Sequence, residues 1–111
     1  MSNFAQDIEK AAGGEPIEAI VIGNYGWGDD DEPDERGVVR ANRHRVLGWA
    51  EARPLLDYTY DTGYGGPDCH PIHAWTPTRV LFVATNDGAP SITSVPRAPG
   101  PEPKPGYVSG E

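Results

Sequence analysis

The chain has 111 residues, a formal net charge of −8 and a single cysteine, Cys69. This length predicts one domain with a thin core, because a domain of this size buries only about 60–65% of the surface that its unfolded chain exposes. The acidic balance argues against a protein that binds nucleic acid directly or lies on a membrane, since both functions need a basic surface.

The cysteine content and the first residues predict a cytoplasmic protein. Cys69 cannot form a disulfide within the chain, and residues 1–15 lack the charged and then apolar pattern of a secretory signal. No apolar run approaches the roughly 20 residues that cross a bilayer. We therefore expect a protein of the cytoplasm, or of the host cytoplasm if a phage encodes it, that is a monomer or a weak homo-oligomer.

The first quarter of the chain predicts a short helix and then a strand. Ser2 or Asn3 is suited to cap a helix that begins at Phe4, and Gly13-Gly14 ends it. Residues 17–22 are rich in β-branched side chains and apolar on both faces, which predicts a strand in the middle of a sheet. Helical and strand patterns in one small domain indicate an α+β fold.

The second half of the chain predicts a short helix, a short strand near Tyr58 and then a β-meander. Trp49 to Leu56 contains good helix formers, although Pro54 has to end or kink that helix. Asp87-Gly88 between two apolar runs is a strong hairpin signal. The expected strands of this small antiparallel sheet are residues 72–76, 79–85 and 91–95.

Two segments are too polar or too rich in proline to build a core. Residues 23–37 predict a long surface loop that contains an acidic cluster. Residues 98–111 form a proline-rich tail without apolar periodicity. We expect residues 1–97 to form a single small α+β domain and the tail to lie outside its core.

The acidic cluster and the aromatic residues before it indicate an interface. Residues 29–35 hold six of the 17 acidic residues, which leaves 11 acids against nine Lys and Arg elsewhere. Tyr and Trp are preferred interface anchors, and neighbouring acids attract a basic partner. We expect a non-enzymatic protein that binds a basic surface of another protein. The expected binding residues are Tyr25, Trp27, Asp29, Asp30, Asp31, Glu32, Asp34 and Glu35. A solvated loop and a mimic of DNA phosphates are the alternatives.

A second region could hold a ligand. Cys69, His70 and His73 bring sulfur and imidazole groups within five residues, but this spacing matches no strong zinc pattern, and His70 and His73 point to opposite faces of an extended segment. Adjacent side chains also rarely form a nucleophile and its base. We expect no cofactor, no metal and no catalytic residue. The alternative is a small-molecule or metal site built from Tyr58, Tyr64, Cys69, His70 and His73.

A short pattern runs through the second half of the chain. It consists of Asp61-Thr62-Gly63-Tyr64-Gly65, Ala74-Trp75-Thr76, Asp87-Gly88 and Val95-Pro96-Arg97. This pattern resembles uncharacterised small acidic proteins of bacteria and their phages. The resemblance implies only a phage or mobile-element setting, in which an accessory or inhibitor protein is expected. A minor structural component of a virion or other assembly, with the tail reaching a neighbour, is a further alternative.

Overall fold

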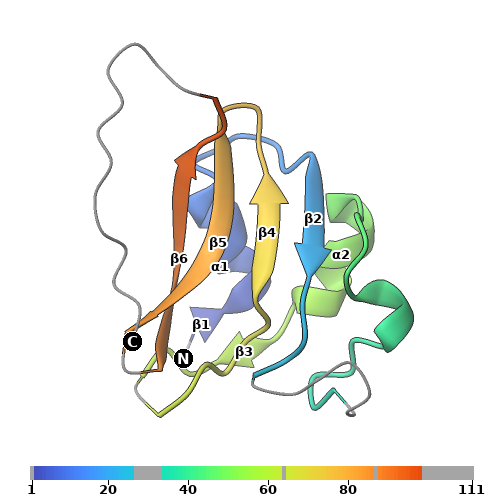
Figure 1. Cartoon of the computed structure of the whole chain (residues 1–111), viewed down its shortest axis with the longest axis vertical. Helices are drawn as coiled ribbons and strands as arrows, with labels where there is room; N and C mark the ends of the chain where they lie inside the picture. Colours follow the sequence, from blue (N-terminus) through green and yellow to red (C-terminus); the bar gives the residue numbers. More distant parts are fainter. Residues whose placement is uncertain (1, 27–33, 64, 87, 99–111) are drawn as a thin grey trace.

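The computed structural model describes residues 2–26, 34–63, 65–86 and 88–98 and has the predicted α+β architecture (Figure 1). One antiparallel sheet has the strand order β2-β4-β5-β6, and β1 and β3 form a second sheet of two strands. The strands are β1 (Ser2–Asn3), β2 (Ala19–Ile22), β3 (Thr59–Tyr60), β4 (Ile72–Trp75), β5 (Arg79–Asn86) and β6 (Ala89–Pro96). The helices are α1 (Phe4–Ala11), the short 3-10 helix η1 (Arg40–Asn42) and α2 (Trp49–Leu56). None of the helices in the described ranges is long and apolar enough to cross a membrane.

The first helix begins and ends where the sequence predicts. The side chain of Asn3 caps α1 by accepting a hydrogen bond of 3.0 Å from the Gln6 amide. Gly13 and Gly14, with φ angles of 65° and 88°, turn the chain out of the helix. The buried side of α1 packs into the core through Phe4 and Ile8.

The strand predicted for residues 17–22 is present as β2, but its expected position in the middle of the sheet is wrong. β2 pairs with β4 on one side only and is the last strand of the sheet. Its other edge is closed by residues 44–47, where Ile20 and Leu47 exchange two backbone hydrogen bonds of 2.8 and 2.9 Å. A segment that is not itself a strand therefore supplies the protection that a neighbouring strand would give.

The predicted second helix and the β-meander are confirmed. Pro54 is the sixth residue of α2, and the helix ends two residues later at Leu56. Its ring removes one backbone donor near the end of the helix, where the loss disturbs few later bonds. β4, β5 and β6 follow one another as antiparallel neighbours.

The short strand expected near Tyr58 pairs outside the meander. β3 pairs with β1, so that Ser2 lies opposite Tyr60 at the start of the chain. Phe4 then packs between two tyrosine rings, with centroid distances of 5.5 Å to Tyr58 and 5.2 Å to Tyr60. The first residues of the chain are thereby held against residues 58–60.

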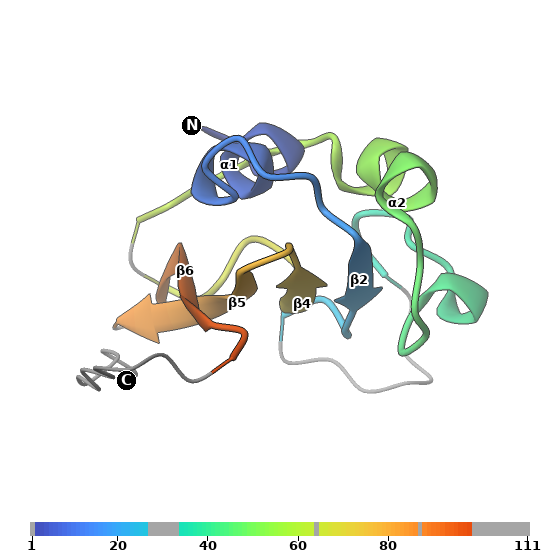
Figure 2. The same cartoon turned by 90° about the horizontal axis from the view of Figure 1, so that it is seen from above.

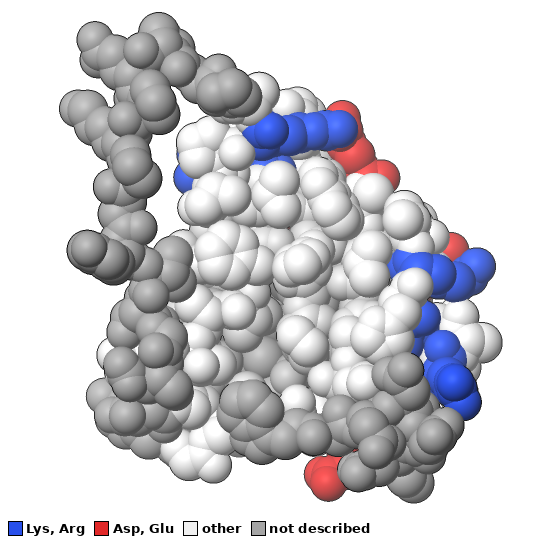
Figure 3. All heavy atoms as spheres, viewed as in Figure 1, with Lys and Arg blue, Asp and Glu red and all other residues white. Residues whose placement is uncertain are grey.

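The two faces of the sheet differ. Both α-helices cover one face (Figure 2), and the core between the layers contains Ile20, Ile22, Ile72, Ala74 and Leu81 from the strands. Cross-strand partners share a face in an antiparallel sheet, so the register assigns the opposite face, here called the open face, to Ala19, Val21, His73, Trp75, Val80, Phe82, Ala84, Ser91, Thr93 and Val95. None of these is charged, and Figure 3 shows the charged side chains at the rim.

The contacts of Phe4 generate a stability prediction. Phe4 is fully buried between the tyrosine rings and the core, so we expect Phe4→Ala to lower the free energy of unfolding by about 3–5 kcal/mol. Urea denaturation measures this change. Gln6→Ala on the exposed side of the same helix is the control and should change stability by less than about 0.5 kcal/mol. Equal effects of the two substitutions would contradict the packing of Phe4 between the two rings.

Candidate functional site

A buried line of hydrogen bonds joins Asp34, His70 and Tyr58. The His70 Nε2 atom lies 2.6 Å from Asp34 Oδ2, and the His70 Nδ1 atom lies 2.7 Å from the Tyr58 hydroxyl. The side chain of His70 is fully buried and that of Asp34 is 3% exposed. Such a line of polar groups is stable inside a protein only because each group has a partner.

A neutral His70 fits the hydrogen bonds along this line. With its proton on Nε2, the ring donates to the Asp34 carboxylate and accepts from the Tyr58 hydroxyl at Nδ1. The Tyr58 oxygen also accepts a hydrogen bond of 3.0 Å from the His70 backbone amide. Burial, which disfavours the charged ring, lowers the pKa of His70, even though the hydrogen bond with Asp34 acts in the opposite direction.

Arg36 forms the second part of the cluster. It donates to both the carboxylate of Asp68, at 2.8 Å, and the Asp68 backbone carbonyl, at 3.1 Å. Its guanidinium carbon lies 4.4 Å from the centroid of the Tyr58 ring, within range of a cation–π interaction. Tyr25 donates to Asp68 as well, at 2.6 Å. Arg36 therefore lies between a carboxylate and an aromatic face.

The electrostatics of Asp68 and Tyr25 follow from these contacts. Burial alone would raise the pKa of Asp68, but hydrogen bonds from Tyr25, from the Asp61 amide and from Arg36 outweigh it and lower that pKa. Burial and the neighbouring carboxylate raise the pKa of Tyr25. Asp68 is therefore the ionised partner of Arg36, and Tyr25 is the donor to it.

The network, defined as Tyr25, Asp34, Arg36, Tyr58, Asp68 and His70, connects two segments that are distant in sequence. Tyr25, Asp34 and Arg36 come from the chain between β2 and η1, and Tyr58, Asp68 and His70 come from the chain between α2 and β4. Asp34 also accepts a hydrogen bond of 2.7 Å from the Arg36 amide, which shapes the chain locally. Tyr25 lies before the acidic segment and Asp34 lies at its end, so the network holds the chain on both sides of residues 27–33.

Cys69 lies next to the network and is an inert thiol. Its side chain is 1% exposed. Burial, together with the negative charge of Asp68, raises the pKa of Cys69 to about 12. A nucleophilic cysteine needs a lowered pKa and access to solvent, and Cys69 has neither.

The structure separates the residues of the sequence-based ligand site. Tyr58, Cys69 and His70 lie together, whereas His73 points from β4 onto the open face. Tyr64 lies outside the described residues. Both ring nitrogens of His70 are already hydrogen-bonded within the protein, so ligand binding by His70 would break one of these bonds. Within the described ranges, no group of three His, Cys, Asp or Glu side chains is arranged to hold a metal ion.

The predicted partner-binding residues also divide into groups. Asp34 is enclosed by the network, and Tyr25 is half-buried with its hydroxyl bonded to Asp68. Glu35 is exposed. The remaining predicted residues, Trp27, Asp29, Asp30, Asp31 and Glu32, lie outside the described residues. The network thus holds Tyr25 and Asp34, which lie on the two sides of residues 27–33 in the sequence.

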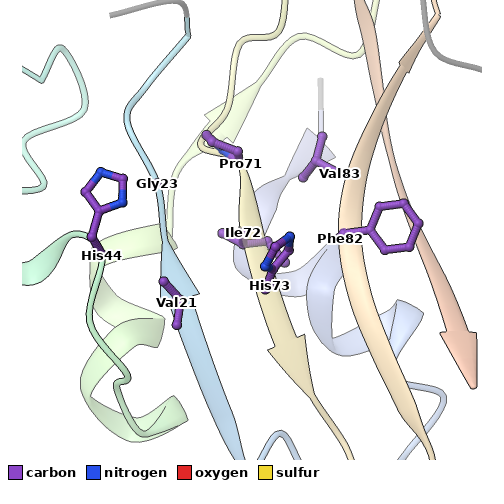
Figure 4. Close-up of a pocket in the computed structure, with 8 residues that line it drawn as sticks. All are labelled: Val21, Gly23, His44, Pro71, Ile72, His73, Phe82 and Val83. Carbon is purple, nitrogen blue, oxygen red and sulfur yellow. The ribbon is translucent and has the colours of Figure 1, made fainter. Parts of the chain in front are cut away.

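A shallow pocket of about 240 Å³ lies on the open face, at the end of the sheet near β2. Figure 4 shows its lining, with His73 and Phe82 on neighbouring strands and His44 on the segment beside β2. His44 has a positive φ of 59° and its ring bonds to the side chain of Asn24 at 3.0 Å. The wall of this pocket is mostly apolar, with Val21 and Pro71 completing it.

The sequence contains a short signal for the network. Asp34-Glu35-Arg36 and Asp68-Cys69-His70 both place an acid two residues before a basic side chain. In the structure, the acid of each triplet pairs with the basic side chain of the other. Asp34 pairs with His70, and Asp68 pairs with Arg36. A pattern of three residues is common in proteins, so only the tertiary contact identifies it as a site.

Comparison with protein-family models, with curated proteins and with solved structures gives no match, so the site is interpreted from its own geometry.

The neutral state of His70 predicts how stability depends on pH. Because the pKa of His70 is lower in the folded protein than its ordinary value of 6.5, the unfolded chain binds the proton more tightly. The stabilisation is therefore complete above pH 6.5 and is lost as the pH falls towards the folded pKa. Urea denaturation between pH 7.5 and 5 measures this loss.

Two substitutions identify the responsible group. His70→Gln cannot titrate, so we expect it to flatten the pH dependence over this range. His73→Gln removes an exposed imidazole that takes no part in the network and is the matched control for the substitution itself. The assignment fails if the slope persists in His70→Gln.

The buried thiol gives a second prediction. At pH 8, iodoacetamide should modify Cys69 in the native protein at least about 100 times more slowly than in urea-unfolded protein, because the reactive thiolate is both rare and enclosed. Mass spectrometry of timed samples measures both rates. Comparable rates would mean that the loops around Cys69 open readily.

Proposed function

We propose that this chain is a non-enzymatic interaction protein whose acidic segment binds a basic surface of another protein. In the phage or mobile-element setting, the partner is a host protein. The observation that carries the proposal is the network, which holds the chain at Tyr25 and at Asp34, on both sides of residues 27–33. The partner-facing residues are Trp27, Asp29, Asp30, Asp31, Glu32 and Glu35.

The cost of the network supports this assignment. Burying Asp34 and His70 requires that both lose their hydration, and a hydrophobic pair would serve stability equally well. A polar pair instead specifies one arrangement of the two loops. A fixed base lowers the entropy lost when the segment binds, and this improves affinity.

The distribution of charge supports it further. Several acids elsewhere in the described chain are neutralised within the domain, since Glu9 bonds to Arg53, Glu18 to Arg97 and Glu51 to Arg45. Residues 29–35 contain no Lys or Arg. Concentrated negative charge of this kind attracts a basic partner over several ångströms and raises the association rate.

The same geometry favours the interaction function over an enzyme. In catalytic triads a carboxylate orients a histidine towards a nucleophile that faces the substrate. Here the histidine faces the hydroxyl of Tyr58, and burial raises the pKa of that hydroxyl far above its ordinary value. The tyrosine is thus a proton donor inside the fold, where it supports the loops.

Neutralising the segment tests the proposal once the partner has been captured from the native host. In the variant Asp29→Asn, Asp30→Asn, Asp31→Asn and Glu32→Gln, we expect association to slow by about tenfold or more at low salt and its salt dependence to flatten. Stopped-flow or surface-based kinetics at several salt concentrations measures both. Trp27→Ala should instead raise the dissociation rate.

The control variant changes the net charge by the same amount at other sites. It carries Glu15→Gln, Glu18→Gln, Glu51→Gln and Asp57→Asn, all on the surface of the domain. If both variants slow association equally, only the overall charge matters. An unchanged rate and salt slope in the first variant would reject the acidic segment as the binding element.

A further inference from the structure

The open face of the sheet differs from the usual solvent-facing side of an antiparallel sheet. Such a sheet normally alternates between a buried apolar face and a polar face. Here the solvent side carries one apolar row across the strands and, beside it, an uncharged row in which apolar and polar side chains alternate. The row nearest the end of β6 contains Val95, Val80, Trp75 and Ala19, and the next row contains Thr93, Phe82, His73 and Val21.

Part of this apolar surface is accessible. Val95 is 43% exposed, and Trp75 and Phe82 are each partly exposed. The rings of His73 and Trp75 meet edge to face with centroids 6.3 Å apart. Figure 3 shows this region as a continuous uncharged surface. Contiguous apolar surface rimmed by charged groups marks a binding site.

The position of the chain end identifies an occupant. The last described residue is Ala98, directly after β6, and the Arg97 amide bonds to Thr78 at 2.9 Å beside β5. The chain continues for 13 residues from this point. It therefore leaves the domain at the edge of the row formed by Val95, Val80 and Trp75.

The sequence after Ala98 suits an uncharged surface. Proline stands at positions 99, 101, 103 and 105, and Tyr107 follows. Such a sequence favours the extended polyproline helix. Glu102 and Lys104 are the charged residues of this stretch and have opposite signs, so residues 99–107 carry no net charge.

The prolines also indicate whether the segment binds to the face of the sheet or pairs along its edge. A segment in which alternate residues lack an amide hydrogen is a poor additional strand beside β6. Proline-rich segments instead bind aromatic surfaces through their rings, and little entropy is lost because they are already extended. Trp75 and Phe82 supply such a surface on the open face.

We propose that the open face is a binding surface for a proline-rich segment, and that its occupant is residues 99–107 of the same chain. Tyr107 lies in the pocket beside Val21, His73 and Phe82. This proposal concerns a different surface from the acidic segment and does not depend on the proposed function.

The distances permit this arrangement. The pocket lies about three strand spacings from β6, or about 14 Å, and about 13 Å along the strands from Arg97. The direct separation is about 19 Å, whereas nine extended residues span about 28 Å. A short tether gives an effective concentration of about 1 mM, so a dissociation constant of about 0.1 mM keeps the segment docked about 90% of the time.

Paramagnetic relaxation in the full chain tests the proposal. A nitroxide is attached through Ser109→Cys, and Cys69 remains in place because its buried thiol is inert. We expect strong broadening of the amide signals of Val21, His73 and Phe82, and none on the outer side of α1 or α2. Broadening confined to the neighbours of Arg97 would overturn the proposal.

Two matched variants and one mixture complete the experiment. Tyr107→Gly should weaken docking about tenfold and nearly halve the docked population, whereas Val108→Gly, outside the proposed occupant 99–107, should leave the broadening unchanged. Equal effects of the two variants would reject Tyr107 as the anchor. Isotope-labelled protein without the nitroxide is then mixed with unlabelled, spin-labelled protein. Broadening in that mixture would overturn docking within one chain and assign the segment to a second copy.

Discussion

The hydrogen bonds of His70 hold together parts of the molecule that no regular element connects. The neutral imidazole with its proton on Nε2 satisfies Asp34 as a donor and Tyr58 as an acceptor. Arg36 and Asp68 then pack over the same tyrosine. The two long loops consequently take one arrangement relative to each other and to the sheet. Loss of the His70 side chain would remove the hydrogen bonds to both Asp34 and Tyr58 and would therefore loosen both segments together.

The charges of the chain are unevenly distributed. Residues 29–35 hold six of the 17 acidic residues, whereas the open face has no charge among the ten strand residues assigned to it. The two features offer different kinds of recognition. A charged segment gives fast, salt-dependent association, and an apolar face gives slow dissociation. In the two proposals above, the acidic segment binds a partner protein and the open face binds the proline-rich segment of the same chain.

The sequence predicted the helices and strands better than it predicted which strands lie side by side. The helix capped by Asn3 and the hairpin between β5 and β6 depend on residues that are close in sequence, and both predictions are confirmed. The prediction that β2 lies in the middle of the sheet was wrong, because apolar residues on both faces of a strand do not require a neighbouring strand on both edges. Ile20 and Ile22 face the core, whereas Val21 lies on the open face. The network joins residues 34–36 to residues 68–70, and no local pattern reports a contact of that separation.

The pairing of β1 with β3 has a consequence for how the domain forms. The first residues of the chain meet residue 60, and α1 contacts β6, which is the last strand. An N-terminal part of the chain therefore has no complete core to bury its apolar side until nearly the whole domain is available. Contacts between residues so distant in sequence make folding slower. The apolar side of α1 is fully covered only once the last strand is present.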